Sequence, residues 1–180
     1  MVSRTGYTGE DGFEVYCDNE GVVKVWQEIM KAGEEFGIKP TGLGCRDTLR
    51  FEASLPLYGH EMDDVITPLE AGFKYFVKLD KDTDYIGKEA LNKQWDAGLE
   101  RKLVGIELID KGIAREGYEV YKDGEKIGHV TTGYKSPTLG KVIGNALIAT
   151  EFTALGTEVD VKIRNKFAKA KVISKKFLKK

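Results

Sequence analysis

The central motif of this chain is Gly117-Tyr118-Glu119-Val120-Tyr121-Lys122-Asp123-Gly124-Glu125-Lys126-Ile127-Gly128-His129-Val130-Thr131-Thr132, which has the features of an antiparallel hairpin. Two strand-like runs, 117–122 and 126–132, flank Asp123-Gly124, a dipeptide typical of a tight two-residue turn. Further strand-like runs occur at 102–109, 141–148, 158–164 and 167–173. Short, closely spaced strands with turn residues between them predict a small antiparallel barrel or a sandwich.

Residues before about 98 follow a mixed pattern of helix and strand. Period-two alternation predicts strands, and apolar residues at helical spacing predict amphipathic helices. Strands are expected at 13–17 and 69–79, and helices at 21–36, 45–53 and 86–95. We therefore predict an α+β fold with two domains, a partial α/β-sheet region at 1–98 and a small antiparallel β-barrel at 99–180.

Composition excludes several classes of function. The 28 basic and 29 acidic side chains give a net charge of −1, so the chain has no general attraction to nucleic acid or anionic membranes, and any anion site must be local. Cys17, Cys45, His60 and His129 lack the spacing of a metal site or of a disulfide framework. No apolar run approaches the ~20 residues of a membrane span, and no signal peptide is evident. We expect a soluble intracellular protein that binds no metal.

The glycine-rich stretch Gly6-Tyr7-Thr8-Gly9-Glu10-Asp11-Gly12-Phe13-Glu14 is the first candidate for a binding site. Its glycines permit tight backbone geometry and close approach to a ligand, and Glu14 begins the predicted strand. An ordinary turn before a strand accounts for the same spacing. The stretch lacks the GxGxxG spacing of a dinucleotide site and precedes a strand instead of a helix.

Arginines supply the second candidate. Arg46 and Arg50 lie four positions apart in a predicted helix, and Arg46 falls in its first turn, where anions are favoured. They suit a carboxylate or phosphate clamp, although pairing of Arg46 with Glu52 or a neighbouring acid, and of Arg50 with Asp47, explains the pattern as well. Arg115, between turn glycines, either faces a pocket between the two parts of the chain or is a solvated loop charge.

A collinear series of motifs runs through essentially the whole chain: 3–14 (SRTGYTGEDGFE), 42–53 (GLGCRDTLRFEA), 57–61 (LYGHE), 67–71 (TPLEA), 85–88 (YIGK), 115–119 (REGYE), 127–133 (IGHVTTG) and 136–138 (SPT). In order and spacing they resemble the C-terminal half of the T-protein of the glycine cleavage system, a tetrahydrofolate-dependent aminomethyltransferase. The resemblance implies that residues 1–98 are the remainder of a folate-binding region and that residues 99–180 are the C-terminal barrel.

The resemblance also implies roles for individual residues. Glu14 matches the glutamate that holds the pterin, and a carboxylate can accept both the 2-amino group and the N3–H of that ring. Arg46 matches the arginine associated with the acidic end of folate, Tyr7 matches a tyrosine lining the same site, and Arg115 is a weaker match. No catalytic residue is expected in this chain, because the conserved aspartate of the family belongs to the N-terminal portion.

By resemblance, the function is transfer of a methylene group from aminomethyl-lipoyl H-protein to tetrahydrofolate, with release of ammonia. The expected partners are lipoylated H-protein and the N-terminal half of the T-protein. The alternatives are a folate-binding module without transfer activity and the folate domain of a dimethylglycine or sarcosine oxidase. The expected location is the cytoplasm of a bacterium, or the mitochondrial matrix of a eukaryote.

Overall fold

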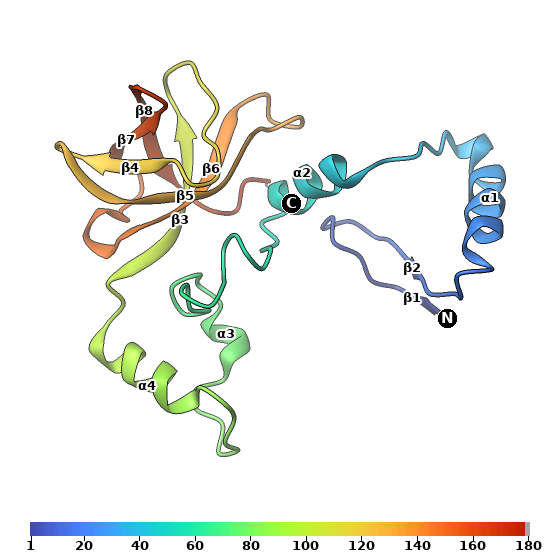
Figure 1. Cartoon of the computed structure of the whole chain (residues 1–180), viewed down its shortest axis with the longest axis horizontal. Coiled ribbons are helices and arrows are strands. Elements are labelled where there is room, and N and C mark those ends of the chain that lie inside the picture. The colour runs from blue at the N-terminus through green and yellow to red at the C-terminus, as the bar shows by residue number, and fades with distance from the viewer. Residues whose placement is uncertain (179–180) are drawn as a thin grey trace. The chain divides into compact units, whose positions relative to one another are not determined.

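The computed structural model describes residues 1–178 of the 180-residue chain and forms two compact units, Met1–Leu55 and Pro56–Lys180 (Figure 1). The last two residues of the predicted barrel domain, 179–180, therefore lie outside the described part. Among the described residues, no helix is long and apolar enough to cross a membrane. The same residues contain no group of histidine, cysteine and carboxylate side chains that could hold a metal ion.

The first unit consists of short elements joined by long loops. In chain order these are β1 (Val2–Ser3), β2 (Glu14–Val15), α1 (Val22–Ala32), the 3-10 helix η1 (Glu34–Phe36) and α2 (Leu43–Glu52). The predicted strand and both predicted helices are present, although the strand is shorter than expected. The helix predicted at 21–36 is divided at Gly33, and Gly37 ends η1 in the left-handed region at φ 70°.

Almost nothing in the first unit is buried. All residues of 1–55 are described, and only Arg50, Phe51 and Glu52, at the end of α2, are buried. Helix α1 has no buried residue, although apolar side chains recur along it at helical spacing. Since helices of this length owe most of their stability to packing of an apolar face, this unit has little core of its own.

The second unit begins with α3 (Lys74–Val77) and α4 (Lys88–Ala97) and continues into six strands and the 3-10 helix η2 (Thr150–Phe152). The strands are β3 (Arg101–Leu108), β4 (Glu119–Lys122), β5 (Glu125–Lys135), β6 (Val142–Ala149), β7 (Glu158–Ile163) and β8 (Lys166–Ile173). They form a closed antiparallel barrel in the order β3-β6-β5-β4-β7-β8, with β8 pairing back onto β3. The predicted barrel is confirmed, and the sandwich alternative is excluded.

The hairpin at the centre of the sequence is the β4–β5 pair. Both turn residues lie in the left-handed region, Asp123 at φ 51° and Gly124 at φ 85°, as a type I′ turn requires. Inward-facing side chains from all six strands then fill the barrel. Its fully buried core includes Ile106, Val130 and Val161.

The strand predicted at 69–79 is wrong. This segment forms turns and the short helix α3. The Thr67 N–H donates to Glu70 Oε2 (2.9 Å), and the Glu70 N–H donates to Thr67 Oγ1 (3.3 Å). These side-chain bonds to the backbone fix a helical turn, and Gly72 then reverses the chain at φ 85°. The alternation of apolar residues does not show that these side-chain bonds favour a turn over a strand.

The compact units divide the chain differently from the predicted domains, 1–98 and 99–180. Residue 98 falls between α4 and β3, within the second unit. The preceding segment is bonded to the barrel: the Leu103 N–H donates to the Glu70 carbonyl (2.8 Å), and Arg101 Nη2 pairs with the Glu70 carboxylate (2.9 Å). Lys175 also donates to the Ala71 carbonyl (2.7 Å). The change from helix to strand at 98 is therefore not a boundary between compact units.

Candidate functional site

Three of the four residues singled out in the sequence line one pocket of the first unit. Tyr7, Glu14 and Arg46 line a hollow of about 520 Å³ between the β1–β2 loop and the start of α2. Its wall is completed by Thr5, Gly6, Thr8, Gly12, Phe13, Thr41, Gly42, Leu43 and Leu49. The glycine-rich loop is therefore part of a pocket as well as a turn before a strand.

Strand pairing determines the position of Glu14. The β1–β2 register sets Ser3 opposite Glu14, so the carboxylate is fixed where the loop closes. Glu14 Oε2 accepts hydrogen bonds from the Thr5 hydroxyl and from the Tyr16 hydroxyl (3.2 Å). The adjacent negative charge of Glu14 raises the pKa of Tyr16, with a further contribution from their hydrogen bond. Glu14 Oε1 has no hydrogen-bond partner among residues 1–178 and can accept from a ligand.

Helix α2 positions Arg46. Its guanidinium carbon lies 4.4 Å from the centroid of the Tyr7 ring, a cation–π contact that joins the two segments of the pocket. Within the described part of the chain Arg46 has no ion pair, so the alternative pairing with Glu52 is not observed. The guanidinium N–H groups can therefore bind an anion.

The second arginine of the predicted clamp has another role. Arg50 is fully buried, and its Nε donates to Asp47 Oδ1 (2.6 Å). Its Nη1 donates to the Leu55 carbonyl (3.2 Å) and so holds the end of α2. The pairing of Arg50 with Asp47 is confirmed, and a clamp that uses both arginines is not formed.

The first turn of α2 adds to the electrostatics of the pocket. Gly42 caps the helix in an extended conformation (φ −110°) without a side-chain bond to the free N–H groups, and both Gly42 and Leu43 line the hollow. Unpaired N–H groups and the helix dipole favour negative charge at this end. The pocket therefore contains a carboxylate acceptor from Glu14 as well as a region around Arg46 that favours anions.

Arg115 belongs to the second unit. It lies 5.6 Å from the Tyr134 ring and lines a different hollow, on the barrel. Its side chain is exposed and borders a hollow formed by the barrel segments alone. It is not among the residues lining the Glu14 pocket.

The hydroxyl partners of Glu14 were not anticipated. Tyr16 lies two positions after Glu14, just beyond the end of β2, a spacing that in extended chain puts both side chains on one face. Thr5 lies two positions after Ser3, the strand partner of Glu14. The first signal is present in the sequence, whereas the second depends on a register that only the structure provides.

Two further motifs meet in the second unit and have a structural role. Glu61 is buried, and its Oε1 accepts from the Thr132 hydroxyl (2.5 Å) and the Thr131 hydroxyl (3.2 Å). Its Oε2 accepts from the Leu57 N–H (2.9 Å). A buried carboxylate with several donors joins segments about 70 residues apart. The motifs at 57–61 and 127–133 therefore hold the chain segment around Glu61 against strand β5 of the barrel.

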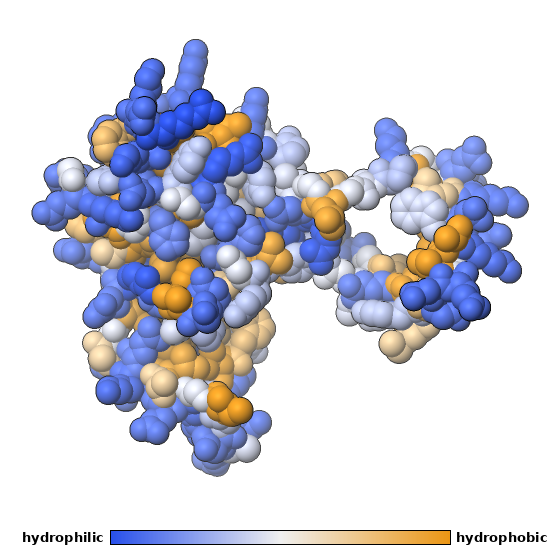
Figure 2. Space-filling view, viewed as in Figure 1, coloured by the Kyte–Doolittle hydropathy of each residue, from blue (hydrophilic) through white to orange (hydrophobic). Residues whose placement is uncertain are grey.

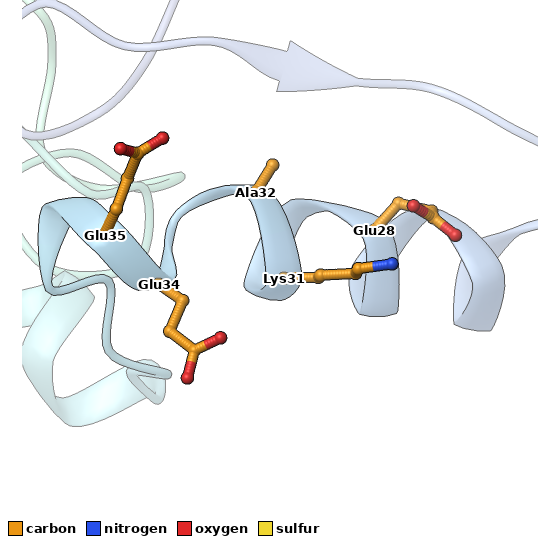
Figure 3. A pocket seen from close by; sticks show the side chains of 5 residues that line it. All are labelled: Glu28, Lys31, Ala32, Glu34 and Glu35. Carbon is orange, nitrogen blue, oxygen red and sulfur yellow. The ribbon is translucent and has the colours of Figure 1, made fainter.

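Another hollow of the first unit lies along α1 and η1. Figure 3 shows Glu28 and Lys31 on α1, and Glu34 and Glu35 on the short helix with their carboxylates directed apart. With Ala32, these residues provide no aromatic wall and only one cation. The hollow therefore does not match a site for a planar, acidic ligand.

Comparison with known proteins matches both parts of the chain to one family. The GCVT N-terminal domain family model matches residues 1–81, and the glycine cleavage T-protein C-terminal barrel domain model matches residues 101–179. An aminomethyltransferase of Clostridium botulinum (strain Okra / Type B1) is 62% identical over 177 residues, which are 98% of this chain and 48% of that protein. An aminomethyltransferase of Geobacillus sp. (strain WCH70) is 62% identical over 179 residues, or 99% of this chain and 49% of that protein.

A solved structure agrees with these matches. The glycine cleavage system aminomethyltransferase T from Bartonella henselae superposes with a TM-score of 0.91 at 27% identity, covering 98% of this chain and 49% of that one. The chain thus spans about half the length of the curated relatives it matches.

Proposed function

Since this chain belongs to the glycine cleavage T-protein family, we propose that it supplies the pterin-binding pocket and the barrel of a tetrahydrofolate-dependent aminomethyltransferase. The family and the transferase class of its relatives support the reaction. The observation that carries the proposal is that Tyr7, Glu14 and Arg46, from two separate motifs, line one hollow of about 520 Å³. That volume is within the usual range of small-molecule sites, roughly 300–1,000 Å³.

The chemistry of the pocket fits a reduced pterin with an acidic tail. Glu14 is held through Oε2, which leaves Oε1 for the N–H donors of the pterin ring. The Arg46 guanidinium, stacked on Tyr7, presents a planar set of donors suited to a carboxylate. A ligand with donors at one end and carboxylates at the other would satisfy both residues.

In this proposal the residues of the chain position the acceptor and do not perform a covalent step. The methylene group passes from the aminomethyl-lipoyl arm of H-protein to a nitrogen of tetrahydrofolate, and ammonia is released. Holding the pterin by Glu14 and the acidic end by Arg46 restricts the orientation of that nitrogen, which contributes to catalysis through proximity. Arg115, in the second unit, remains a weaker prediction for folate.

The expected partners are lipoylated H-protein and the polypeptide that makes up the rest of the relatives' length. The second partner is supported by the first unit, where Trp26, Val23 and Phe36 are exposed and α1 has no buried residue. Figure 2 shows hydrophobic surface over this part of the chain. An apolar helix face of this kind needs a protein surface to cover it.

Calorimetric titration of the 180-residue chain with tetrahydrofolate tests the pocket. We expect binding that Glu14→Gln weakens about tenfold, because the amide offers one acceptor and no charge, equivalent to about 1.4 kcal/mol. Glu20→Gln, an exposed carboxylate outside the pocket, is the matched control and should leave the affinity unchanged. Equal affinities for the Glu14 variant and the wild type would refute the assignment.

Turnover separates the transferase from a folate-binding module. With aminomethyl-lipoyl H-protein and tetrahydrofolate, we expect little ammonia release from the chain alone. Release should increase when the remaining half of a relative is added. Binding of tetrahydrofolate without turnover in the completed assembly would favour a binding module. Full turnover by the chain alone would show that the residues described here include the catalytic group.

A further inference from the structure

A second hollow, on the barrel, has a different chemistry from the Glu14 pocket. It measures about 660 Å³ and is formed by the loop after β3 and the turn between β7 and β8. Its cationic residues are Lys111, Arg115, Arg164 and Lys166, and its apolar wall includes Ile113 and Phe167. The two segments are about 50 residues apart in the chain, so the cluster is produced by the closure of the barrel.

The charges of this cluster are uncompensated. Among residues 1–178, none of the four cationic side chains is in an ion pair. The acid that lines the hollow, Asp110, accepts the Lys169 N–H through Oδ2 (2.8 Å). Four cations and one carboxylate give the hollow a formal charge of +3, in a chain whose total is −1. A concentration of positive charge of this kind favours the binding of an anion.

Several cations elsewhere on the barrel are paired. Lys126 and Lys162 both pair with Glu119 (2.8 and 3.1 Å). Lys169 pairs with Asp160 (2.8 Å), and Lys141 pairs with Glu107 (3.0 Å). Within the described part of the chain, single unpaired cations such as Lys102 also occur on the barrel strands, but this hollow gathers four of them.

The turn backbone at Arg164 and the Tyr134 ring beside Arg115 restrict the positions that these two side chains can take. Ile163 pairs with Lys166 across a two-residue turn, and Arg164 in that turn has φ 56°, a left-handed conformation that a side chain rarely adopts. The Arg115 guanidinium lies 5.6 Å from the Tyr134 ring, a contact that leaves the edge of the fork available for an anion. Restricting the side chains in advance reduces the entropy lost on binding.

We propose that this hollow is a binding site for a small organic anion that carries two or more negative charges and a flat apolar group. The charges match the four cations, and the flat group matches Ile113 and the exposed Phe167 ring, which is itself held edge-on by Tyr121 (5.2 Å between centroids). The volume of about 660 Å³ is within the usual range of small-molecule sites, roughly 300–1,000 Å³.

The test is an NMR titration of the ¹⁵N-labelled 180-residue chain at physiological ionic strength, without divalent cations. Three probes separate the contributions: inorganic pyrophosphate carries the charge alone, ADP carries the charge with a flat ring, and adenosine carries the ring alone. We expect ADP to shift amides of 110–118 and 163–168 and to bind at least fivefold more tightly than pyrophosphate, with no saturable binding of adenosine. The proposal is overturned if neither anion shifts these amides, if pyrophosphate matches ADP, or if adenosine matches ADP.

A charge-matched pair of variants tests the residues. Arg164→Gln with Lys166→Gln should weaken ADP binding at least tenfold, whereas Lys93→Gln with Lys102→Gln should leave it unchanged. Both variants remove two exposed cations with no ion pair in the described chain, so they alter the net charge equally. Equal weakening by both would show non-specific attraction and overturn the assignment.

The fold of each variant is checked by the amide spectrum outside the hollow. Arg115→Gln, which lies on the other segment and leaves the turn intact, is the second variant and should also weaken ADP binding several-fold. Unchanged binding in both hollow variants would contradict the proposal. Because the probes contain no pterin and the readout is not transfer activity, this result is independent of the proposed role of the Glu14 pocket.

Discussion

Arg46 and Arg50 show how two identical side chains, one helical turn apart, come to have different roles. Arg50 is buried and held by Asp47 and by the Leu55 carbonyl, so it is part of the structure of α2. Arg46 is exposed and rests on the Tyr7 ring. The available guanidinium is thus at the start of the helix, where an anion is favoured.

We predict that the planar guanidinium, and not charge alone, is what the Glu14 pocket needs at position 46. Arg46→Lys keeps the charge but loses the fork and most of the stacking on Tyr7. It should therefore lower tetrahydrofolate affinity nearly as much as Arg46→Gln, about tenfold or about 1.4 kcal/mol. Calorimetry on both variants checks this, and wild-type affinity in Arg46→Lys would show that a point charge is sufficient.

Glu119 gives the barrel a defined response to acid. Hydrogen bonds from Lys126, Lys162 and Tyr121 lower its pKa from 4.5 to about 2. The unfolded chain therefore takes up the proton first, so the stabilisation is complete above pH 4.5 and is lost as the pH falls toward 2. We expect the urea midpoint of the barrel to fall across that window.

The matched variants identify the source of this acid sensitivity. Glu119→Gln should show a smaller fall in urea midpoint between pH 5 and pH 2.5 than the wild type does. Glu125→Gln removes an exposed carboxylate on the adjacent strand that has no ion pair among the described residues, and it should follow the wild type. The same slope in Glu119→Gln and the wild type would remove Glu119 as the cause.

At the scale of elements, the barrel depends on close approach between β5 and β6. A Cβ added at Gly128 would lie 2.0 Å from the Leu147 carbonyl oxygen and 2.8 Å from the Ile148 Cα, both backbone atoms of the paired strand. Neither atom can move without breaking the pairing. The glycine at this position is therefore required by the close packing of the two strands.

We predict that Gly128→Ala destabilises the barrel by about 3 kcal/mol, the upper end of the usual cost of overpacking. Urea unfolding followed by far-UV circular dichroism measures the change in the free energy of unfolding. Gly124→Asn is the control: Gly124 lies in the turn at φ 85°, with open space around it, and asparagine tolerates the left-handed region at a cost of about 1 kcal/mol. A smaller effect at Gly128 than at Gly124 would contradict the packing argument.

At the scale of the whole molecule, the two units differ in how much core each contains. The second unit has a closed barrel with a continuous buried interior. In the first unit, burial is confined to the end of α2. Local stability follows buried apolar contact, so the units should open independently.

Amide hydrogen exchange of the chain checks this expectation. We expect strong protection in β3–β8 and weak protection in residues 1–49. Addition of the remaining half of a relative should increase the protection of α1, because its apolar face would then be covered. Equal protection of α1 and the barrel strands in the chain alone would show that the first unit needs no partner for stability.

Elements whose signals are local and repeated can be predicted from the residue pattern. Strand periodicity and the Asp123-Gly124 turn predict the barrel strands, and collinear motifs identify the family together with Tyr7, Glu14 and Arg46 as candidates. Local signals failed at 69–79, where side-chain bonds between Thr67 and Glu70 override the apolar alternation. The Thr-x-x-Glu spacing is itself a helix-start signal, and it opposes the apolar alternation of the same segment.

Tertiary structure alone decided which of these residues act together. Barrel closure and the β1–β2 register that gives Glu14 its Thr5 partner both depend on pairing between segments separated in the sequence. The same holds for the unpaired cations that collect on the barrel from segments about 50 residues apart. The periodicity of apolar residues predicts which helix or strand a residue belongs to. Whether its side chain is free to bind a ligand depends on the neighbours that the fold brings to it.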